Sequence, residues 1–162
     1  MVENGSLLTV ARGQTRTPSS ISDRTMIPET RKWFRTEAAT KDAISALRSV
    51  SPIGMPARYY DLLAFSNGGE GPLPVQPYYF CLDTAEMAID AARVGDCEEF
   101  FAKFFVFGSN GGGEFIAFDM RADVPWPVVA IDMTNIDLKE SVVPIAPDFE
   151  RFIAMIGLEA DG

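Results

Sequence analysis

The spacing of hydrophobic residues predicts two helices at the start of the chain's periodic region. In the first, Thr40 is a suitable N-cap, Ile44 and Leu47 share one helical face, and Ser51-Pro52 ends the pattern. The second helix is predicted to begin with Pro56 at its first position. Its apolar stripe contains Tyr59, Leu62 and Leu63, widened by Tyr60 and Phe65.

A turn is predicted after the second helix. Asn67, Gly68 and Gly69 are expected to end the helix, because glycine and asparagine adopt the left-handed conformation that stops helices. Residues 70–74, which begin with Glu70 and contain two prolines, are predicted to form a loop.

The middle of the chain changes to short apolar runs that are typical of β-strands. Strands are predicted over residues 78–82, 104–108, 115–119, 128–133 and 141–145. A helix is predicted between the first two, from Asp83 to about Val94, because Asp83 and Glu86 have the spacing of a capping box. Its buried side would contain Met87, Ala88 and Ala91.

A last helix is predicted after Pro147 and Asp148, and Gly157 is expected to end it. Its apolar positions at i, i+3, i+4 and i+7 are Phe149, Phe152, Ile153 and Ile156. Helices before and after a cluster of strands predict an α+β fold. We expect a single domain with a largely antiparallel central sheet and helices packed against it.

The two ends of the chain differ from this body. Residues 1–30 are rich in Ser, Thr, Arg, Gly and Pro, and they offer too little apolar surface to offset the entropy of ordering. We therefore predict a flexible N-terminal extension over residues 1–35, a folded body over 36–158 and a tail over 159–162. Trp33 and Phe34 are expected to be the first side chains that dock on the core.

The central hairpin, residues 104–120 (FFVFGSNGGGEFIAFDM), contains more glycine than one tight turn requires. Asn110, Gly111, Gly112 and Gly113 are predicted to supply positive φ there. The loop is either wide and mobile, or another group approaches its backbone closely. We treat it first as the central turn of the fold and second as a binding edge.

The hairpin loop also has the spacing of a phosphate-binding loop, from Gly108 to Gly113. However, Glu114 and Phe115 stand where that motif needs Lys and Ser/Thr, and a carboxylate there would repel phosphate. The sequence therefore predicts no nucleotide cofactor at this loop.

Composition narrows the chemistry further. The 162 residues include no histidine, which removes Ser-His-Asp catalysis, Cys-His catalysis and imidazole metal ligands. Cys81 and Cys97 lack metal or redox spacing and are predicted to be reduced thiols. Oxygen ligands are present at Asp132, Asn135, Asp137 and Glu140, but without the EF-hand pattern, so no metal is predicted. Asp119 and Asp132 lie on neighbouring predicted strands and could form a carboxylate pair.

The net charge of the chain is −9, and the charged residues are distributed unevenly along it. Residues 1–50 hold 8 basic and 5 acidic residues, or +3, whereas residues 51–162 hold 6 and 18, or −12. An acidic body repels nucleic acid and anionic membranes and favours basic partners. Without a membrane-length apolar run or a signal-peptide pattern, the chain is predicted to be cytoplasmic.

Several of these features, taken in order, resemble one family. They are Met55-Pro56 between two helices, Asn67-Gly68-Gly69-Glu70, the glycine-rich hairpin, and Ile145-Ala146 followed by Phe149 and Phe152. Over residues 40–156 the chain resembles the SUKH superfamily. Its founding members are yeast regulators of cell-wall assembly and killer-toxin resistance, and bacterial immunity proteins dominate it.

The resemblance implies a domain without catalytic residues that acts by binding other proteins. Our first hypothesis is an immunity-type protein that neutralises a toxin, with a basic nuclease as the candidate partner. The second is a regulatory or scaffolding module like the fungal regulators, and the third is a small hydrolase or ligand-binding protein. Candidate contacts are Glu70, Asn110, Glu114 and Trp126; the last is either an interface anchor or a plug on the core.

Overall fold

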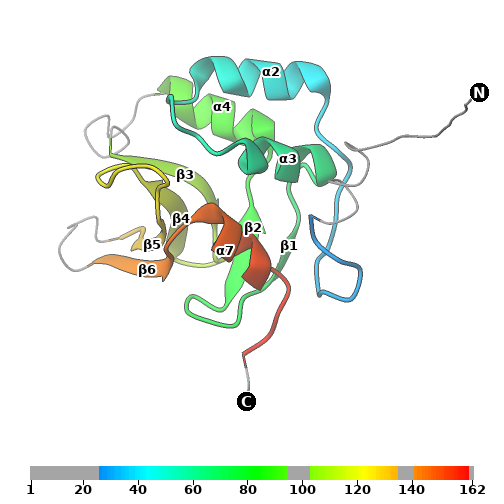
Figure 1. Ribbon diagram of the computed structural model, residues 1–162, viewed down its shortest axis with the longest axis vertical. Helices are drawn as coiled ribbons and strands as arrows, with labels where there is room; N and C mark the ends of the chain where they lie inside the picture. Colours follow the sequence, from blue (N-terminus) through cyan, green and yellow to red (C-terminus); the bar gives the residue numbers. More distant parts are fainter. Residues whose placement is uncertain (1–25, 95–102, 135–140, 161–162) are drawn as a thin grey trace, which may run out of the picture.

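The computed structural model describes residues 26–94, 103–134 and 141–160. Figure 1 shows a curled sheet with helices packed against it. Within the described residues, the helices are α2 (Lys41–Val50), α3 (Ala57–Phe65), α4 (Ala85–Val94) and α7 (Phe149–Met155). The strands are β1 (Glu70–Pro72), β2 (Tyr79–Leu82), β3 (Phe104–Ser109), β4 (Glu114–Asp119), β5 (Val128–Asp132) and β6 (Val142–Ala146). The predicted α+β class is confirmed.

The six strands form one antiparallel sheet in which spatial order follows chain order, from β1 to β6. The predicted central hairpin is β3 and β4, and Ser109 pairs with Phe115 next to its loop. Strands β1 and β2 lie on one side of this hairpin, and β5 and β6 lie on the other. The glycine loop therefore projects from the middle of one end of the sheet.

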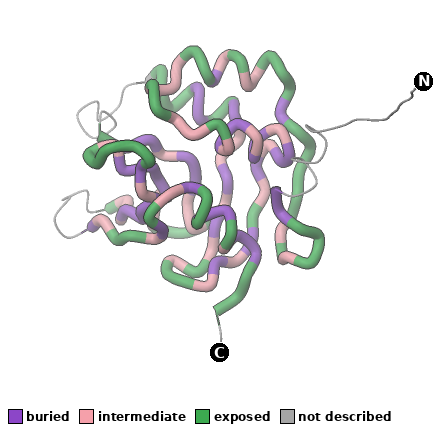
Figure 2. Tube along the Cα trace, in the orientation of Figure 1, coloured by how far each residue is buried: buried purple, intermediate pink, exposed green. Residues whose placement is uncertain are grey.

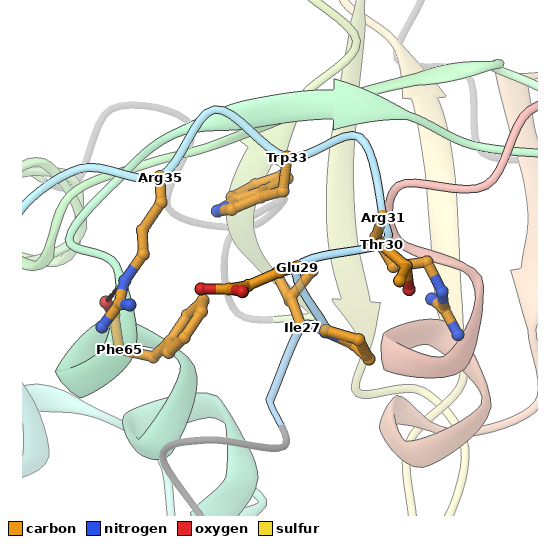
Figure 3. A pocket seen from close by; sticks show the side chains of 8 residues that line it. Ile27, Glu29, Thr30, Arg31, Trp33, Arg35 and Phe65 are labelled. Atoms are coloured by element: carbon orange, nitrogen blue, oxygen red, sulfur yellow. Dashed lines mark hydrogen bonds between the residues drawn. The ribbon is translucent and has the colours of Figure 1, made fainter.

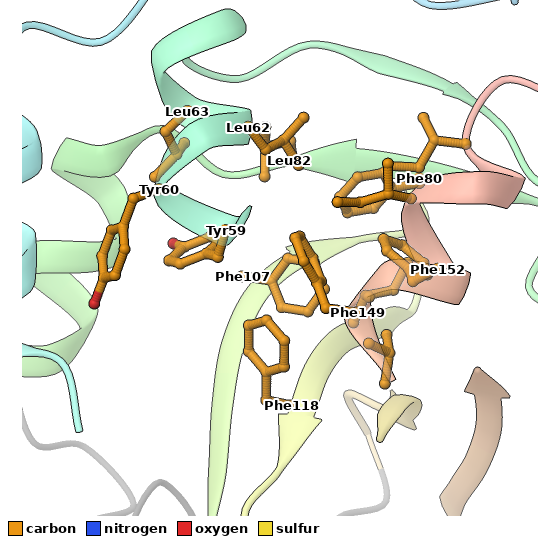
Figure 4. Packing of buried hydrophobic residues seen from close by; sticks show 14 of the residues in the cluster. Tyr59, Tyr60, Leu62, Leu63, Phe80, Leu82, Phe107, Phe118, Phe149 and Phe152 are labelled. Atoms are coloured by element: carbon orange, nitrogen blue, oxygen red, sulfur yellow. The ribbon is translucent and has the colours of Figure 1, made fainter. Parts of the chain in front are cut away.

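Figure 2 marks buried residues along the strands of the sheet. Aromatic side chains fill the space between the sheet and the helices (Figure 4). Phe107 and Phe118 stack with 4.6 Å between their ring centroids. Tyr59 of α3 meets both rings edge-on, at 5.9 and 5.8 Å. Phe152 of α7 meets Phe107 edge-on at 5.7 Å. Side chains from α3, early in the chain, and from α7, near its C-terminus, thus pack on the hairpin strands.

Two helix starts are as the sequence predicts, within one residue. The Thr40 hydroxyl accepts a hydrogen bond from the backbone N–H of Ala43 at 3.0 Å, and the Asp148 carboxylate accepts one from Arg151 at 2.8 Å. Pro56 is the residue before α3 rather than its first residue. Its fixed φ still suits this position.

The start of α4 differs from the prediction. The Thr84 hydroxyl, not the Asp83 carboxylate, accepts the capping hydrogen bond, from the N–H of Met87 at 3.1 Å. The predicted buried side was wrong for Met87 and Ala91, which are exposed, and correct for Ala88. The side of α4 that packs on the domain consists of Ala85, Ala88 and Ile89.

The described part of the predicted extension packs on the domain. We call residues 26–39 the N-terminal strap. Met26 and Ile27 are only 1% and 4% exposed, and the Trp33 ring stacks on Phe80 with 5.8 Å between centroids. The backbone of Phe34 exchanges hydrogen bonds with Glu70 at 2.8 and 3.3 Å. Within the described residues, packing therefore begins at Met26 rather than at Trp33, and the Phe34 side chain, which was expected to dock on the core, is 75% exposed. Residues 1–25 lie outside the described part.

The strap also explains why residues 70–72 are a strand rather than a loop. Glu70 and Pro72 pair with Cys81 and Tyr79 of β2 on one side, and Phe34 of the strap covers the other side of Glu70. Backbone groups of β1 thus have partners on both sides. Its prolines made this stretch look like a loop, yet proline is compatible with a short edge strand.

Candidate interaction surface

The candidate surface is the sheet face opposite the helices, near the glycine loop. In an antiparallel sheet, directly paired residues point to the same face. Glu70 pairs with Cys81, which pairs with Ser109, so all three side chains lie on one face. Tyr79 lies two residues before Cys81 and shares this face. We call Glu70, Tyr79, Cys81, Ser109 and Gly111 the hairpin face.

The glycine loop folds over this face. A Cβ atom placed on Gly111 would lie 3.3 Å from the Cys81 sulfur and 3.7 Å from Cδ2 of Tyr79. Gly111 is also the residue of the loop with positive φ, at 78°. The structure therefore brings together two parts of the predicted contact set, Glu70 on β1 and the loop that contains Asn110.

The Asn110 side chain organises the loop. Its Oδ1 atom accepts hydrogen bonds from the backbone N–H groups of Gly112 and Glu114 at 2.9 and 3.0 Å. Its Nδ2 donates to the Glu114 carboxylate at 3.2 Å. Because this side chain closes the turn, only Gly111 needs the left-handed conformation. The prediction of positive φ was wrong for Asn110, Gly112 and Gly113.

Carboxylates surround the loop end of the sheet. Glu70 is exposed, and Glu114 pairs directly with Asp132 across β4 and β5. The Tyr79 hydroxyl donates a hydrogen bond to the Glu70 carboxylate, which raises the pKa of Tyr79 to about 12. Burial raises the pKa of the Cys81 thiol, so it stays protonated at neutral pH and is a poor nucleophile. This surface is suited to binding rather than to thiol chemistry.

Trp126 does not belong to this surface. Its side chain is 8% exposed and packs on Phe118, with 6.3 Å between ring centroids. The ring also packs against Gly54, where an added Cβ atom would lie 3.3 Å from Cζ2 of Trp126. Of the two roles expected from sequence, the structure places Trp126 as a plug on the core, where a partner could not reach the ring.

The Asn67-Gly68-Gly69 turn has a structural role different from the one expected. The helix before it ends at Phe65, and Ser66 is extended, so neither glycine forms the helix cap. Gly68 and Gly69 have φ of 103° and 108°. The Asn67 side chain accepts a hydrogen bond from the N–H of Ala85 at 2.7 Å and donates one to Glu86 at 2.9 Å. The turn therefore ties α3 to the start of α4.

The candidate carboxylate pair is separated by the length of a strand. Asp119 ends β4 and its N–H donates to the carbonyl of Pro127, whereas Asp132 lies at the other end of β5, opposite Glu114. Five residues of strand span roughly 16 Å, beyond the reach of a carboxylate pair that shares one sugar bond. Asp119 instead forms a two-pronged ion pair with Arg121 at 2.9 and 2.8 Å.

This ion pair sets the protonation of Asp119. Burial alone would raise its pKa, but hydrogen bonds from Arg121 outweigh burial and hold the pKa below its usual range. A carboxylate that stays charged and neutralised in this way is structural. Of the oxygen ligands considered for a metal, residues 135–140 lie outside the described part. No group of three or more metal-ligating side chains occurs among the residues that the structure describes.

Sequence reasoning missed the polar centre that holds the strap. Ser66 is fully buried, and its hydroxyl accepts hydrogen bonds from the N–H of Thr36 at 3.1 Å and from Trp33 Nε1 at 3.3 Å. It donates to the carbonyl of Gly68 at 2.7 Å. A serine directly after a helix carries no distinctive signal, so nothing in the sequence pointed to this role.

The comparison with known families identifies the fold family. Residues 38–155 match the model of the SMI1 / KNR4 family (SUKH-1). The chain belongs to this family. A search of curated proteins gave no significant match. Along the described part of the chain, no helix has both the length and the apolar character needed to cross a bilayer.

Proposed function

We propose that this SUKH-family protein is an immunity-type protein that neutralises a toxin by binding it directly, without catalysing a reaction. The observation that carries the proposal is the charge of −12 over residues 51–162, in a family whose members include immunity proteins. Enzymes that cut nucleic acids need a basic surface for the phosphate backbone. An acidic protein of this kind would be steered to such a toxin and could cover its cleft.

The hairpin face is the proposed contact. Glu70 supplies negative charge on this face, and Glu114 and Asp132 add negative charge at the loop end, where their side chains alternate to the helix side of the sheet. Tyr79 offers an aromatic ring of the kind that anchors interfaces. Asn110 and its hydrogen bonds hold the loop in one conformation before binding. A preorganised loop loses less entropy when a partner binds.

The decisive experiment is co-expression with toxin domains encoded next to this gene. Rescue of growth together with a 1:1 complex in size-exclusion chromatography would support the proposal. The paired substitution of Glu70 and Glu114 by Gln should slow association and reduce its dependence on salt. Asp90→Gln on exposed α4 is the matched control, and its association rate should be unchanged. If no neighbouring toxin is bound or neutralised, the immunity role is refuted.

A regulatory or scaffolding module remains the second candidate, with the N-terminal segment as an additional contact. The structure shows where to cut, because residues 26–39 are packed on the domain. Removal of residues 1–25 should leave toxin neutralisation intact if the folded body is the inhibitor. Loss of partner binding after this deletion would favour the regulatory module instead.

A further inference from the structure

The strap and the end of α3 enclose a pocket that the hairpin face does not use (Figure 3). Its volume is about 740 Å³, within the range of known binding pockets. Ile27 and Phe65 are buried in its wall at 4% and 6% exposure, and Trp33 is half-buried. The pocket therefore offers apolar and aromatic surface to an occupant.

Arg35 is the polar group that is best placed in this pocket. Its guanidinium carbon lies 3.8 Å from the centre of the Phe65 ring, and its Nε donates to the Phe65 carbonyl at 2.8 Å. Arg35 forms no ion pair with any residue that the structure describes. Its two terminal nitrogens are thus available, and stacking already restricts the side chain that would hold a carboxylate.

The strap has the opposite charge to the rest of the protein. Residues 26–39 hold three basic residues and two acidic residues, or +1, against −12 for residues 51–162. Lys32 is paired with Glu159 at 2.6 Å, and Arg31 donates to the carbonyl of Ile156 at 2.8 Å. Figure 3 shows the Glu29 carboxylate pointing into the pocket, toward Phe65. Arg35 therefore attracts a negatively charged occupant, whereas Glu29 repels it.

We propose that this pocket binds an acidic peptide segment of a partner protein. A carboxylate of the segment pairs with the terminal nitrogens of Arg35, and a neighbouring apolar side chain packs on Trp33 and Ile27. The net positive charge of the strap attracts the segment, while Glu29 weakens its binding. This contact is independent of the hairpin face, which favours basic partners.

The test uses the full chain and a displayed library of random peptides. Enriched peptides should share an Asp or Glu next to an aromatic or aliphatic residue. Synthetic copies with blocked ends are then titrated while the indole N–H signal of Trp33 and the Nε–H signal of Arg35 are followed by NMR. Both signals should shift, and replacing the acidic residue of the peptide by its amide should weaken binding about tenfold.

Protein variants separate the pocket from general electrostatics. Arg35→Gln should weaken binding about tenfold, and Glu29→Gln should strengthen it by roughly two- to fivefold. Arg48→Gln is the matched control, because Arg48 lies 4.1 Å over the Tyr60 ring on another surface; binding should not change. The proposal is overturned if no peptide is enriched, if enriched peptides are basic, or if they bind Arg35→Gln equally well. Phenylacetate binding as tightly as the peptides would reassign the pocket to small organic anions.

Discussion

The backbone carbonyl oxygen of Lys32 occupies the space that a Cβ atom on Gly71 would need. Gly71 lies in the middle of β1, and the strap crosses it at this point. Likewise, a Cβ atom on Gly69 would lie only 2.6 Å from the carbonyl oxygen of Phe34. The strap can pack closely on the domain because these positions have no side chain.

We expect Gly71→Ala to lower the free energy of unfolding by about 2 kcal/mol or more, since a methyl group would push backbone against backbone. Urea denaturation followed by circular dichroism measures the change. Gly113→Ala is the control, because no atom lies within 4 Å of its added methyl group. Equal losses in the two variants would show that the close approach has no energetic consequence.

The glycines of the hairpin loop should differ in the same way. Gly111→Ala is expected to cost about 1 kcal/mol, because φ at this position is 78° and an L side chain is strained there. Gly112→Ala should have little effect, since Gly112 lacks a left-handed φ and its nearest neighbour would be 3.5 Å away. Thermal melting of both variants distinguishes them. A loss for Gly112→Ala as large as for Gly111→Ala would contradict this account.

Tyr59→Phe should make the protein more stable. The Tyr59 hydroxyl is buried and has no hydrogen-bond partner in the described structure, and burial raises its pKa above the usual value. Removing an unsatisfied buried hydroxyl should raise the free energy of unfolding by about 1 kcal/mol, while the ring keeps its aromatic contacts. Tyr60→Phe is the control, and its stability should stay close to that of the wild type. A clear loss of stability in Tyr59→Phe would indicate a bound partner for the hydroxyl.

Asp83 should make stability depend on pH. Burial raises its pKa to about 6, above the ordinary value of 3.8. The folded state therefore binds the proton more tightly than the unfolded state, and the stability gained from this falls as pH rises from about 4 to 6. Asp83→Asn should remove this dependence and raise the stability at pH 7 on the order of 1 kcal/mol, because the carboxylate is partly solvated.

The measurement for Asp83 is the difference between wild type and Asp83→Asn across this pH range. The difference is needed because Asp119 also makes the stability of both proteins depend on pH, in the opposite direction. Hydrogen bonds from Arg121 overcome burial and lower its pKa, so its contribution is lost as pH falls. A difference in stability that stays constant from pH 4 to pH 7 would contradict the raised pKa of Asp83.

The sequence predicted most of the fold because its signals are local. Helical spacing around Leu47 and Phe152, the capping residues Thr40 and Asp148, and the glycine turn each depend on neighbours within a few residues. The family resemblance over this order of elements is confirmed by the match over residues 38–155.

Other features could not be predicted, because they depend on residues that are distant in the chain. Strand β1 is paired along its length with β2, and Phe34 pairs with Glu70 from the opposite side. Trp126 is buried because Phe118 and the loop at Gly54 surround it. Asp119 and Asp132 were predicted on adjacent strands, but only the register shows that they lie at opposite ends.

The strap also constrains when the domain can be completed during synthesis. The N–H of Lys32 donates to the carbonyl of Gly157 at 3.0 Å, and the N–H of Gly157 donates to Pro72 at 2.9 Å. A chain leaving the ribosome exposes residues 26–39 before their partners have been made, which are Ser66 and Phe80 for Trp33 and Gly157 for Lys32. Trp33 therefore stays uncovered until Phe80 has been made, and the strap can dock completely only after Gly157 has followed.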